Sequence, residues 1–220
     1  MKSPILEAAD MVVQHEGRIA RTLGALGMAA AIATGQPAMG EPGVKTTTTA
    51  VQKAGTSKIT FSNSFVDFVK QVENAGKKGW NKDDQKWYPH DSPEGGSQTI
   101  AYGHKLNGAE EEKRFAKGIT EQEALALLRK DLDRAWNVAA SYVKAKHDVE
   151  LSSLSEKQQE ILTEYAFNLG TLRGFPKFVQ AVVGEDWDAA KKEYKRTYKD
   201  TNGVRHELTR NTFFYNRYLK

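Results

Sequence analysis

Apolar residues recur at helical spacing in several stretches of the chain from residue 60 onward. The first stretch has apolar side chains at positions i, i+3, i+4 and i+7, which form one face of an amphipathic helix. These residues are Phe65, Phe68, Val69 and Val72. Asn63 or Ser64 can cap the start of this helix, and Gly76 can end it.

The second half of the chain has the pattern of a helical bundle. Thr120 with Glu123 forms a capping box before a long stripe, and Ser155 with Gln158 repeats the box before a helix that Gly170 ends. The long stripe comprises Leu125, Leu128, Leu132, Ala135, Ala139 and Tyr142. A shorter helical stripe comprises Trp187, Ala190, Tyr194 and Tyr198, and a last helix is expected to run to the C-terminus.

Between these helices, residues 77–106 are rich in Gly, Pro, Asp and aromatic residues, which favours a hairpin and loops. Thr99–Tyr102 is a short strand candidate. The order is therefore one helix, a small β-hairpin region and a helical C-terminal lobe. This order predicts an α+β, predominantly helical architecture over residues 60–220.

Residues 1–59 differ in character, because they contain no aromatic residue. An uncharged run extends from Thr22 to Gly40, and the segment from Glu41 to Lys58 has the composition of a linker. Three interpretations of the uncharged run stay open: a weak export or release signal, a helix that docks on a partner protein, and a disordered tail. We therefore divide the chain into an extension over 1–59 and one globular domain over 60–220.

The composition of the chain limits the catalytic and metal-binding chemistry that it can support. Apolar residues make up 39% and charged residues 27%, the balance of a soluble globular protein. The chain has no cysteine, so a thiolate nucleophile, a disulfide and a cysteine-based metal site are excluded. The five histidines show no H-x-x-x-H spacing, and we expect no metal or organic cofactor. They are His15, His90, His104, His147 and His206.

The net charge of +4 suits anionic partners, including the acidic bacterial cell wall. Basic residues alternate with acidic ones, as in Lys191–Arg196, and form no uninterrupted basic stripe. This pattern indicates a solvated surface and disfavours binding to nucleic acid.

Glu73 is the first candidate for chemistry, because it lies at the C-terminal end of the first predicted helix, next to the hairpin region. The negative end of the helix dipole and burial would both favour the protonated carboxyl that a general acid needs. The alternative is a solvated glutamate at a helix end.

A second carboxylate is available in the segment that follows. Asp91 and Glu94 precede a Gly-Gly turn, and Thr99 opens the predicted strand. A carboxylate across a cleft from Glu73 would complete the pair used in glycoside hydrolysis. The Thr99 hydroxyl could position the attacking water, because it both donates and accepts hydrogen bonds. The alternative is a polar turn, with Asp91 in an Asx-turn and Glu94 in solvent.

The sequence T-I-A-Y-G-H-K-L at 99–106 resembles the T-I-G-x-G-H signature of phage-type lysozymes. Other segments resemble this glycoside hydrolase family in the same order, so the resemblance covers roughly residues 64–220. They are G-I-T-E-Q-E-A at 118–124, K-D-L-D at 130–133, Y-A-F-N-L-G at 165–170, G-F-P-K-F at 174–178, D-W-D-A-A at 186–190 and L-T-R-N at 208–211.

The resemblance implies a lysozyme-like fold and a role for each matching residue. Glu73 would be the general acid, Asp91 would activate or order water, and Thr99 would be the active-site threonine. His104 is expected to pair with Asp131 on the long helix. The remaining expected substrate-binding residues are Glu94, His104, Phe167, Asn168 and Arg210.

This sequence departs from the family's shorter spacing, because 17 residues separate Glu73 from Asp91 and seven separate Asp91 from Thr99. The insertion at 76–87 brings in Asp83 and Asp84 as rival carboxylates, and Glu94 is closer to Thr99 than Asp91 is. We keep Asp91 as the preferred second carboxylate, with Glu94 as its alternative. Two added tryptophans indicate a widened glycan cleft or, as we prefer, an apolar cluster that anchors the longer loop. They are Trp80 and Trp87.

The function implied is a muramidase that cleaves the β-1,4 bond between N-acetylmuramic acid and N-acetylglucosamine with inversion. A lytic transglycosylase and a catalytically weak, virion-structural module with a lysozyme fold are the alternatives. The biological setting would be a phage infection. The chain would act in the host cytoplasm or periplasm during lysis, or as a virion-associated enzyme that binds a virion protein through residues 1–59.

Overall fold

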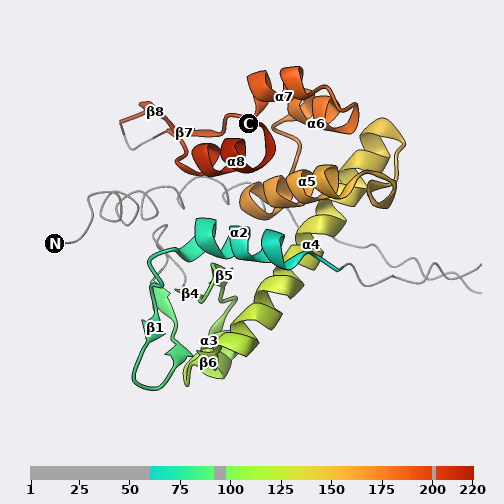
Figure 1. Ribbon diagram of the computed structural model, residues 1–220. Helices are drawn as coiled ribbons and strands as arrows, with labels where there is room; N and C mark the ends of the chain where they lie inside the picture. Colours follow the sequence, from blue (N-terminus) through green and yellow to red (C-terminus); the bar gives the residue numbers. More distant parts are fainter. Residues whose placement is uncertain (1–59, 92–97, 200–201) are drawn as a thin grey trace, which may run out of the picture.

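The computed structural model describes residues 60–91, 98–199 and 202–220 (Figure 1). The predictions for residues 1–59 and for Glu94 therefore lie outside the described residues. The helices are α2 (Asn63–Asn74), α3 (Ala109–Phe115), α4 (Glu121–His147), a 3-10 helix at Leu151–Ser153, α5 (Glu156–Leu169), α6 (Pro176–Val183), α7 (Trp187–Glu193) and α8 (Arg210–Tyr218). The strands are β1 (Trp80–Asn81), β2 (Lys86–Trp87), β3 (His90–Asp91), β4 (Gln98–Ile100), β5 (His104–Lys105), β6 (Ile119–Thr120), β7 (Thr197–Lys199) and β8 (Arg205–Glu207).

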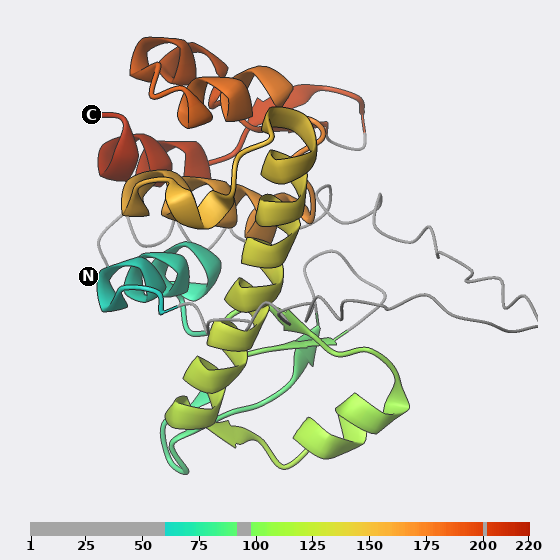
Figure 2. The same ribbon diagram turned by 90° about the vertical axis from the view of Figure 1, so that its right-hand side faces the viewer.

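The long helix α4 connects two lobes (Figures 1 and 2). Its 27 residues span about 40 Å at the usual rise of an α-helix. Strands β1–β6 and α3 gather around its N-terminal half, and α5–α8 pack around its C-terminal half. The fold is thus α+β and predominantly helical, as the sequence predicts.

Both capping boxes are confirmed. The Thr120 hydroxyl accepts from the backbone N–H of Glu123, whose carboxylate accepts from the Thr120 N–H in return. Ser155 and Gln158 make the same reciprocal pair at the start of α5. The end of α5 also falls where expected, because Gly170 adopts a left-handed φ of 70° as its C-cap.

The limits of α2 differ from the prediction by one residue at each end. Ser62, rather than Asn63 or Ser64, is the N-cap, and its hydroxyl accepts from the Phe65 N–H. Ala75 rather than Gly76 ends the helix. The apolar stripe itself is correct, and it packs Phe65, Phe68 and Val69 into the core.

The predicted strand at Thr99–Tyr102 is too long. β4 ends at Ile100, because Ala101 takes a left-handed φ of 53° and starts a turn that returns the chain to β5. The predicted helical stripe through Tyr198 is also too long. α7 ends at Glu193, and Tyr198 lies in the β7–β8 hairpin, where its ring stacks on His206. Arg196, between α7 and the hairpin, is fully buried.

Helix α4 buries its predicted stripe with two changes at the ends. Ala124 and Val143 are buried, whereas their neighbours Leu125 and Tyr142 are only partly so. The middle of the stripe is buried as predicted, and α5 is the principal neighbour of α4. Those middle residues are Leu128, Leu132, Ala135 and Ala139.

The insertion before the second predicted carboxylate forms a small hairpin, β1–β2, which β6 extends to a three-stranded sheet. Trp87 is 1% exposed, and its ring centroid lies 5.1 Å from those of both Trp80 and Tyr102. Its indole N–H donates to Glu121 at 2.7 Å. The structure therefore agrees with the interpretation of the tryptophans as an apolar cluster that anchors the longer loop.

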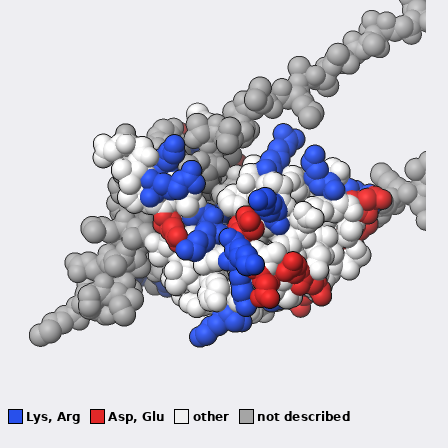
Figure 3. All heavy atoms as spheres, turned by 90° about the horizontal axis from the view of Figure 1, so that it is seen from above, with Lys and Arg blue, Asp and Glu red and all other residues white. Residues whose placement is uncertain are grey.

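Charges of both signs lie side by side on the face seen from above (Figure 3), as the alternation in the sequence predicts. No helix among the described residues is both long and apolar enough to cross a membrane.

Candidate active site

Glu73 is the next-to-last residue of α2, and its side chain is 14% exposed. The turn between β4 and β5 passes directly over its carboxyl group. A Cβ atom on Gly103 would lie 3.1 Å from Glu73 Oε2, and Gly103 has a φ of +79°. Both the space and the backbone conformation therefore require glycine at this position.

The neighbouring Asn74 fixes this turn to the end of α2. Its side-chain amide donates to the carbonyl groups of Ala101 at 2.7 Å and Lys78 at 3.0 Å. Its oxygen accepts from the Lys78 N–H at 2.8 Å. Sequence reasoning missed Asn74, although an asparagine near a helix end can hydrogen-bond to nearby backbone groups.

Arg210 from α8 holds the other side of the Glu73 carboxyl. Its Nη1 donates to Glu73 Oε1 at 2.6 Å, and its Nε donates to Glu164 Oε1 at 2.5 Å. Arg210 is 6% exposed, and its guanidinium group contacts both glutamates. If Arg210 affects substrate binding, as the resemblance implies, it does so by setting the position of Glu73.

Glu164 and Arg196 complete a chain of four charges. Arg196 Nη1 lies 3.0 and 2.9 Å from the two carboxylate oxygens of Glu164, and both residues are fully buried. Asn168, a predicted substrate-binding residue, accepts from the same Arg196 nitrogen at 3.1 Å. Asn168 is therefore hydrogen-bonded to this network.

Glu164 and Arg210 are held in their charged forms. Burial alone would raise the pKa of Glu164, but the guanidinium groups of Arg196 and Arg210 outweigh it and hold that pKa below its usual value. Burial alone would lower the pKa of Arg210, but the carboxylates of Glu73 and Glu164 raise it instead. The charged forms of Glu164 and Arg210 thus stabilise each other although both side chains are almost fully buried.

The second predicted carboxylate has different surroundings. Asp91 is exposed in β3 and pairs with Gln98 of β4. Its backbone carbonyl accepts from Lys78 Nζ at 3.0 Å. Asp84, one of the rival carboxylates, instead accepts from the hydroxyl of Tyr88 within the insertion.

Thr99 is buried in β4 and lies opposite His90 of β3. The Thr99 hydroxyl is 3.3 Å from His90 Nε2. Burial lowers the pKa of His90, which favours the neutral ring. His90 was not among the predicted site residues. Its position beside Asp91 in the sequence gave no sign that it would face the threonine.

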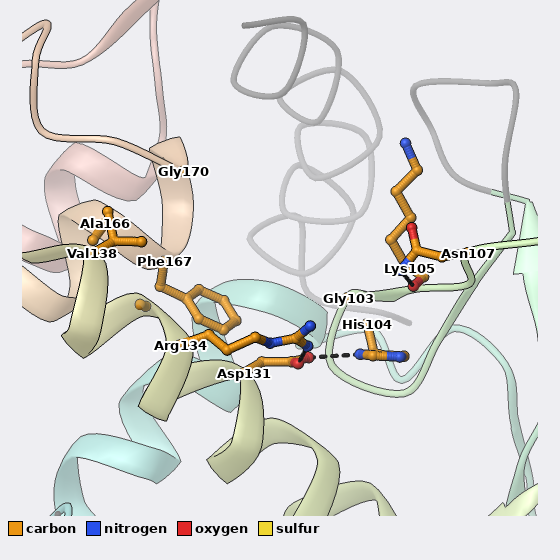
Figure 4. Close-up of a pocket in the computed structure, with 11 residues that line it drawn as sticks. Gly103, His104, Lys105, Asn107, Asp131, Arg134, Val138, Ala166, Phe167 and Gly170 are labelled. Atoms are coloured by element: carbon orange, nitrogen blue, oxygen red, sulfur yellow. Dashed lines mark hydrogen bonds and ion pairs between the residues drawn. The ribbon is translucent and has the colours of Figure 1, made fainter. Parts of the chain in front are cut away.

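His104 pairs with Asp131 of α4, as predicted, with 2.8 Å between Nδ1 and Oδ2. Arg134 contacts the other oxygen of Asp131. The three side chains connect β5 to the long helix, and Figure 4 shows them together.

A pocket of about 270 Å³ opens between β5, α4 and α5 (Figure 4). Phe167 of α5 lines it, and Gly103 lines it from the other side. Gly103 therefore borders both the pocket and the Glu73 carboxyl, although Glu73 itself is not part of the pocket lining. The full lining comprises Gly103, His104, Lys105, Asn107, Asp131, Arg134, Ala135, Val138, Ala166, Phe167 and Gly170.

Residues 78–211 match the family model of phage lysozymes. The match covers more than half of the chain, so the protein belongs to the phage lysozyme family. It is thus a lysozyme of the bacteriophage type, a glycoside hydrolase whose substrate is peptidoglycan. No curated protein and no solved structure matches the chain.

Glu73 lies just before the matched segment, yet its contacts come from inside it. Gly103 covers the carboxyl and Arg210 pairs with it. Among the described residues, no group of three or more histidine, aspartate or glutamate side chains could hold a metal ion.

Proposed function

We propose that this lysozyme is a muramidase that hydrolyses the β-1,4 bond between N-acetylmuramic acid and N-acetylglucosamine, with Glu73 as the general acid. The observation that carries this role is the position of the Glu73 carboxyl. It is 14% exposed, fixed by Arg210, and lies beneath Gly103, which also borders the pocket. A buried, oriented carboxyl beside a glycan groove is what protonation of a leaving oxygen requires.

The second carboxylate acts on water. Asp91 accepts a proton from the attacking water, and the buried Thr99 hydroxyl orients that water. In an inverting enzyme the two carboxyl groups are about 6.5–9.5 Å apart, and the water attacks opposite the leaving group. Asp91 is exposed, which suits a group that works on solvent.

Loss of turbidity in Gram-negative cells stripped of their outer membrane tests this function. The intact chain should clear the suspension, and Glu73→Gln should not. Glu112→Gln serves as a matched control, because Glu112 is an exposed glutamate of α3. Failure of the intact, folded chain to clear the cells would favour a lysozyme fold kept as a virion-structural module.

The biological setting depends on residues 1–59. We propose that the enzyme acts during phage infection, from the host cytoplasm or periplasm at lysis or as part of the virion. If these residues bind a virion protein, their removal abolishes incorporation into particles and spares activity on isolated walls. If they are an export signal, their removal blocks access to the wall only from inside the cell.

A further inference from the structure

Glu164 has no role in the mechanism described above, although it is among the most buried charged groups of the described residues. Its side chain has no exposed surface, and it lies on α5 between Arg196 and Arg210. Burial of an ion pair costs several kcal/mol per ion in desolvation, which apolar side chains would avoid. A function of its charge is therefore worth seeking.

The geometry connects Glu164 to Glu73 through one side chain. Arg210 uses its Nε for Glu164 and its Nη1 for Glu73. Because the guanidinium group is planar and rigid, fixing Nε fixes the direction in which Nη1 points. Arg196 in turn fixes Glu164 from the opposite side with two contacts.

The same arrangement reduces an electrostatic problem in the proposed mechanism. A general acid must carry a proton, yet a guanidinium 2.6 Å from a carboxyl favours its ionised form. Glu164 accepts a hydrogen bond from the same guanidinium and so offsets part of the positive charge that Glu73 experiences. With Glu164 neutral, the full charge of Arg210 would act on Glu73.

We propose that Glu164 is a positioning residue for Glu73: it orients Arg210 toward that carboxyl and offsets the charge of Arg210, so that Glu73 can be protonated. This inference rests on the proposed role of Glu73 as the general acid. It extends that role to a buried residue of α5 that does not touch the pocket lining.

The charged and titratable groups of the network and around it come from α2, α5, α8 and the segment between α7 and β7. Arg210 from α8 faces both glutamates, and Arg196, between α7 and β7, faces Glu164. The ring of Tyr165 on α5 lies 4.3 Å from the Arg196 guanidinium carbon. Tyr218 of α8 interacts electrostatically with Glu164, and burial raises the pKa of its hydroxyl, which keeps that group neutral.

Helix α5 provides a matched control one turn earlier. Glu160 also pairs with an arginine of α8, with 2.9 Å between Glu160 Oε2 and Arg217 Nη2. Its other oxygen accepts from the Ser62 hydroxyl at 2.8 Å, at the start of α2. Glu160 thus ties α5 to α8 and α2 as Glu164 does, but without contact to the arginine that holds Glu73.

The experiment compares the pH dependence of wall hydrolysis in the full-length chain and three variants, each assayed well below its own melting temperature. Glu164→Gln removes a negative charge, so the alkaline fall in kcat should move to lower pH by on the order of one unit. Arg196→Gln removes a positive charge, so the fall should move to higher pH. Glu160→Gln should lower the melting temperature and leave the pH profile unchanged.

Opposite shifts from Glu164→Gln and Arg196→Gln support the proposal, because loss of packing alone would not produce opposite signs. Unchanged profiles in both variants, or the same shift in Glu160→Gln, overturn it. If Glu164→Gln does not fold, the direction of the Arg196→Gln shift decides alone. If the unmodified chain shows no hydrolysis, the proposed function fails instead, and that result is distinct from hydrolysis without a shift.

Discussion

The two carboxylates assigned to the reaction lie in regions of opposite character. Glu73 sits at the end of a helix, covered by a turn and joined to a buried network of the helical lobe. Asp91 sits in a two-residue strand at the edge of a small sheet, exposed, and only its backbone carbonyl accepts a hydrogen bond from the described residues.

This difference matches the two tasks. A general acid must meet one oxygen of the substrate, so its position has to be fixed before the substrate binds. A group that activates water needs access to solvent. The helical lobe therefore supplies rigidity, and the sheet lobe supplies the solvated side of the reaction.

After the loss of activity expected in Glu73→Gln, the largest expected effect is on Asp91, the solvated side of this comparison. Asp91→Asn should lower wall hydrolysis by about 10²-fold or more, the usual contribution of a general base. Its melting temperature should change little, because the side chain is exposed. Glu94→Gln is the paired variant: near-full activity in Asp91→Asn with loss in Glu94→Gln would reverse the assignment.

The next effect is expected from a substitution in the turn that covers Glu73, the buried carboxyl of the comparison. Gly103→Ala would place a methyl group 3.1 Å from Glu73 Oε2 at a φ of +79°. Strain of about 1–2 kcal/mol should lower stability, and displacement of the carboxyl should lower activity roughly tenfold.

Gly108→Ala is the control for that variant. Gly108 has a φ of +83°, but a methyl group there would meet nothing within 4 Å. With a ψ of 171° it lies in a region open essentially to glycine, so Gly108→Ala should lose about 1–3 kcal/mol in thermal unfolding and keep its activity. Equal losses of activity in both variants would show that strain, rather than proximity to Glu73, is responsible.

A smaller effect concerns the helix that joins the two lobes. Thr120→Ala removes the capping hydroxyl of α4 and should cost about 1 kcal/mol in the free energy of unfolding. Activity at room temperature should stay the same, because the cap is far along α4 from the pocket-lining residues Arg134 and Val138. Chemical denaturation checks the loss, and a drop in activity without loss of stability would contradict it.

The smallest effect is expected in the melting temperature at acidic pH. The pKa of Glu164 is held below its usual value in the folded chain, so its pairing contributes stability above an unfolded pKa of about 4.3. That contribution is lost as the pH falls through the lower, folded value. Melting temperatures of Glu164→Gln should therefore depend less on pH below about 4 than those of the unmodified chain. Parallel curves for the two proteins would contradict this.

Local signals in the sequence were sufficient to predict much of the fold. The capping residues Thr120 and Ser155 and the terminating Gly170 act within one or two helical turns, so their pattern is visible in a few residues. The pairing of His104 with Asp131 came from the family resemblance and is present in the structure.

The site's buried network could not be predicted in this way. Arg210 is 137 residues from Glu73 and 46 from Glu164, so no local spacing connects them. A glutamate within an amphipathic helix ordinarily belongs to its solvated face, whereas Glu164 is buried between Arg196 and Arg210, which are 32 and 46 residues away in the sequence. The errors at Ala101 and Tyr198 have the same origin, because tertiary contacts ended elements whose local pattern continued.

Mass spectrometry of the products from purified peptidoglycan tests the central claim most directly, with the intact chain and Glu73→Gln compared side by side. We predict fragments with N-acetylmuramic acid at a reducing end, each carrying the added water of hydrolysis, and none from Glu73→Gln. Products with an anhydro sugar, lighter by one water, would instead identify a lytic transglycosylase. Undiminished products from folded Glu73→Gln would contradict the assignment of the general acid.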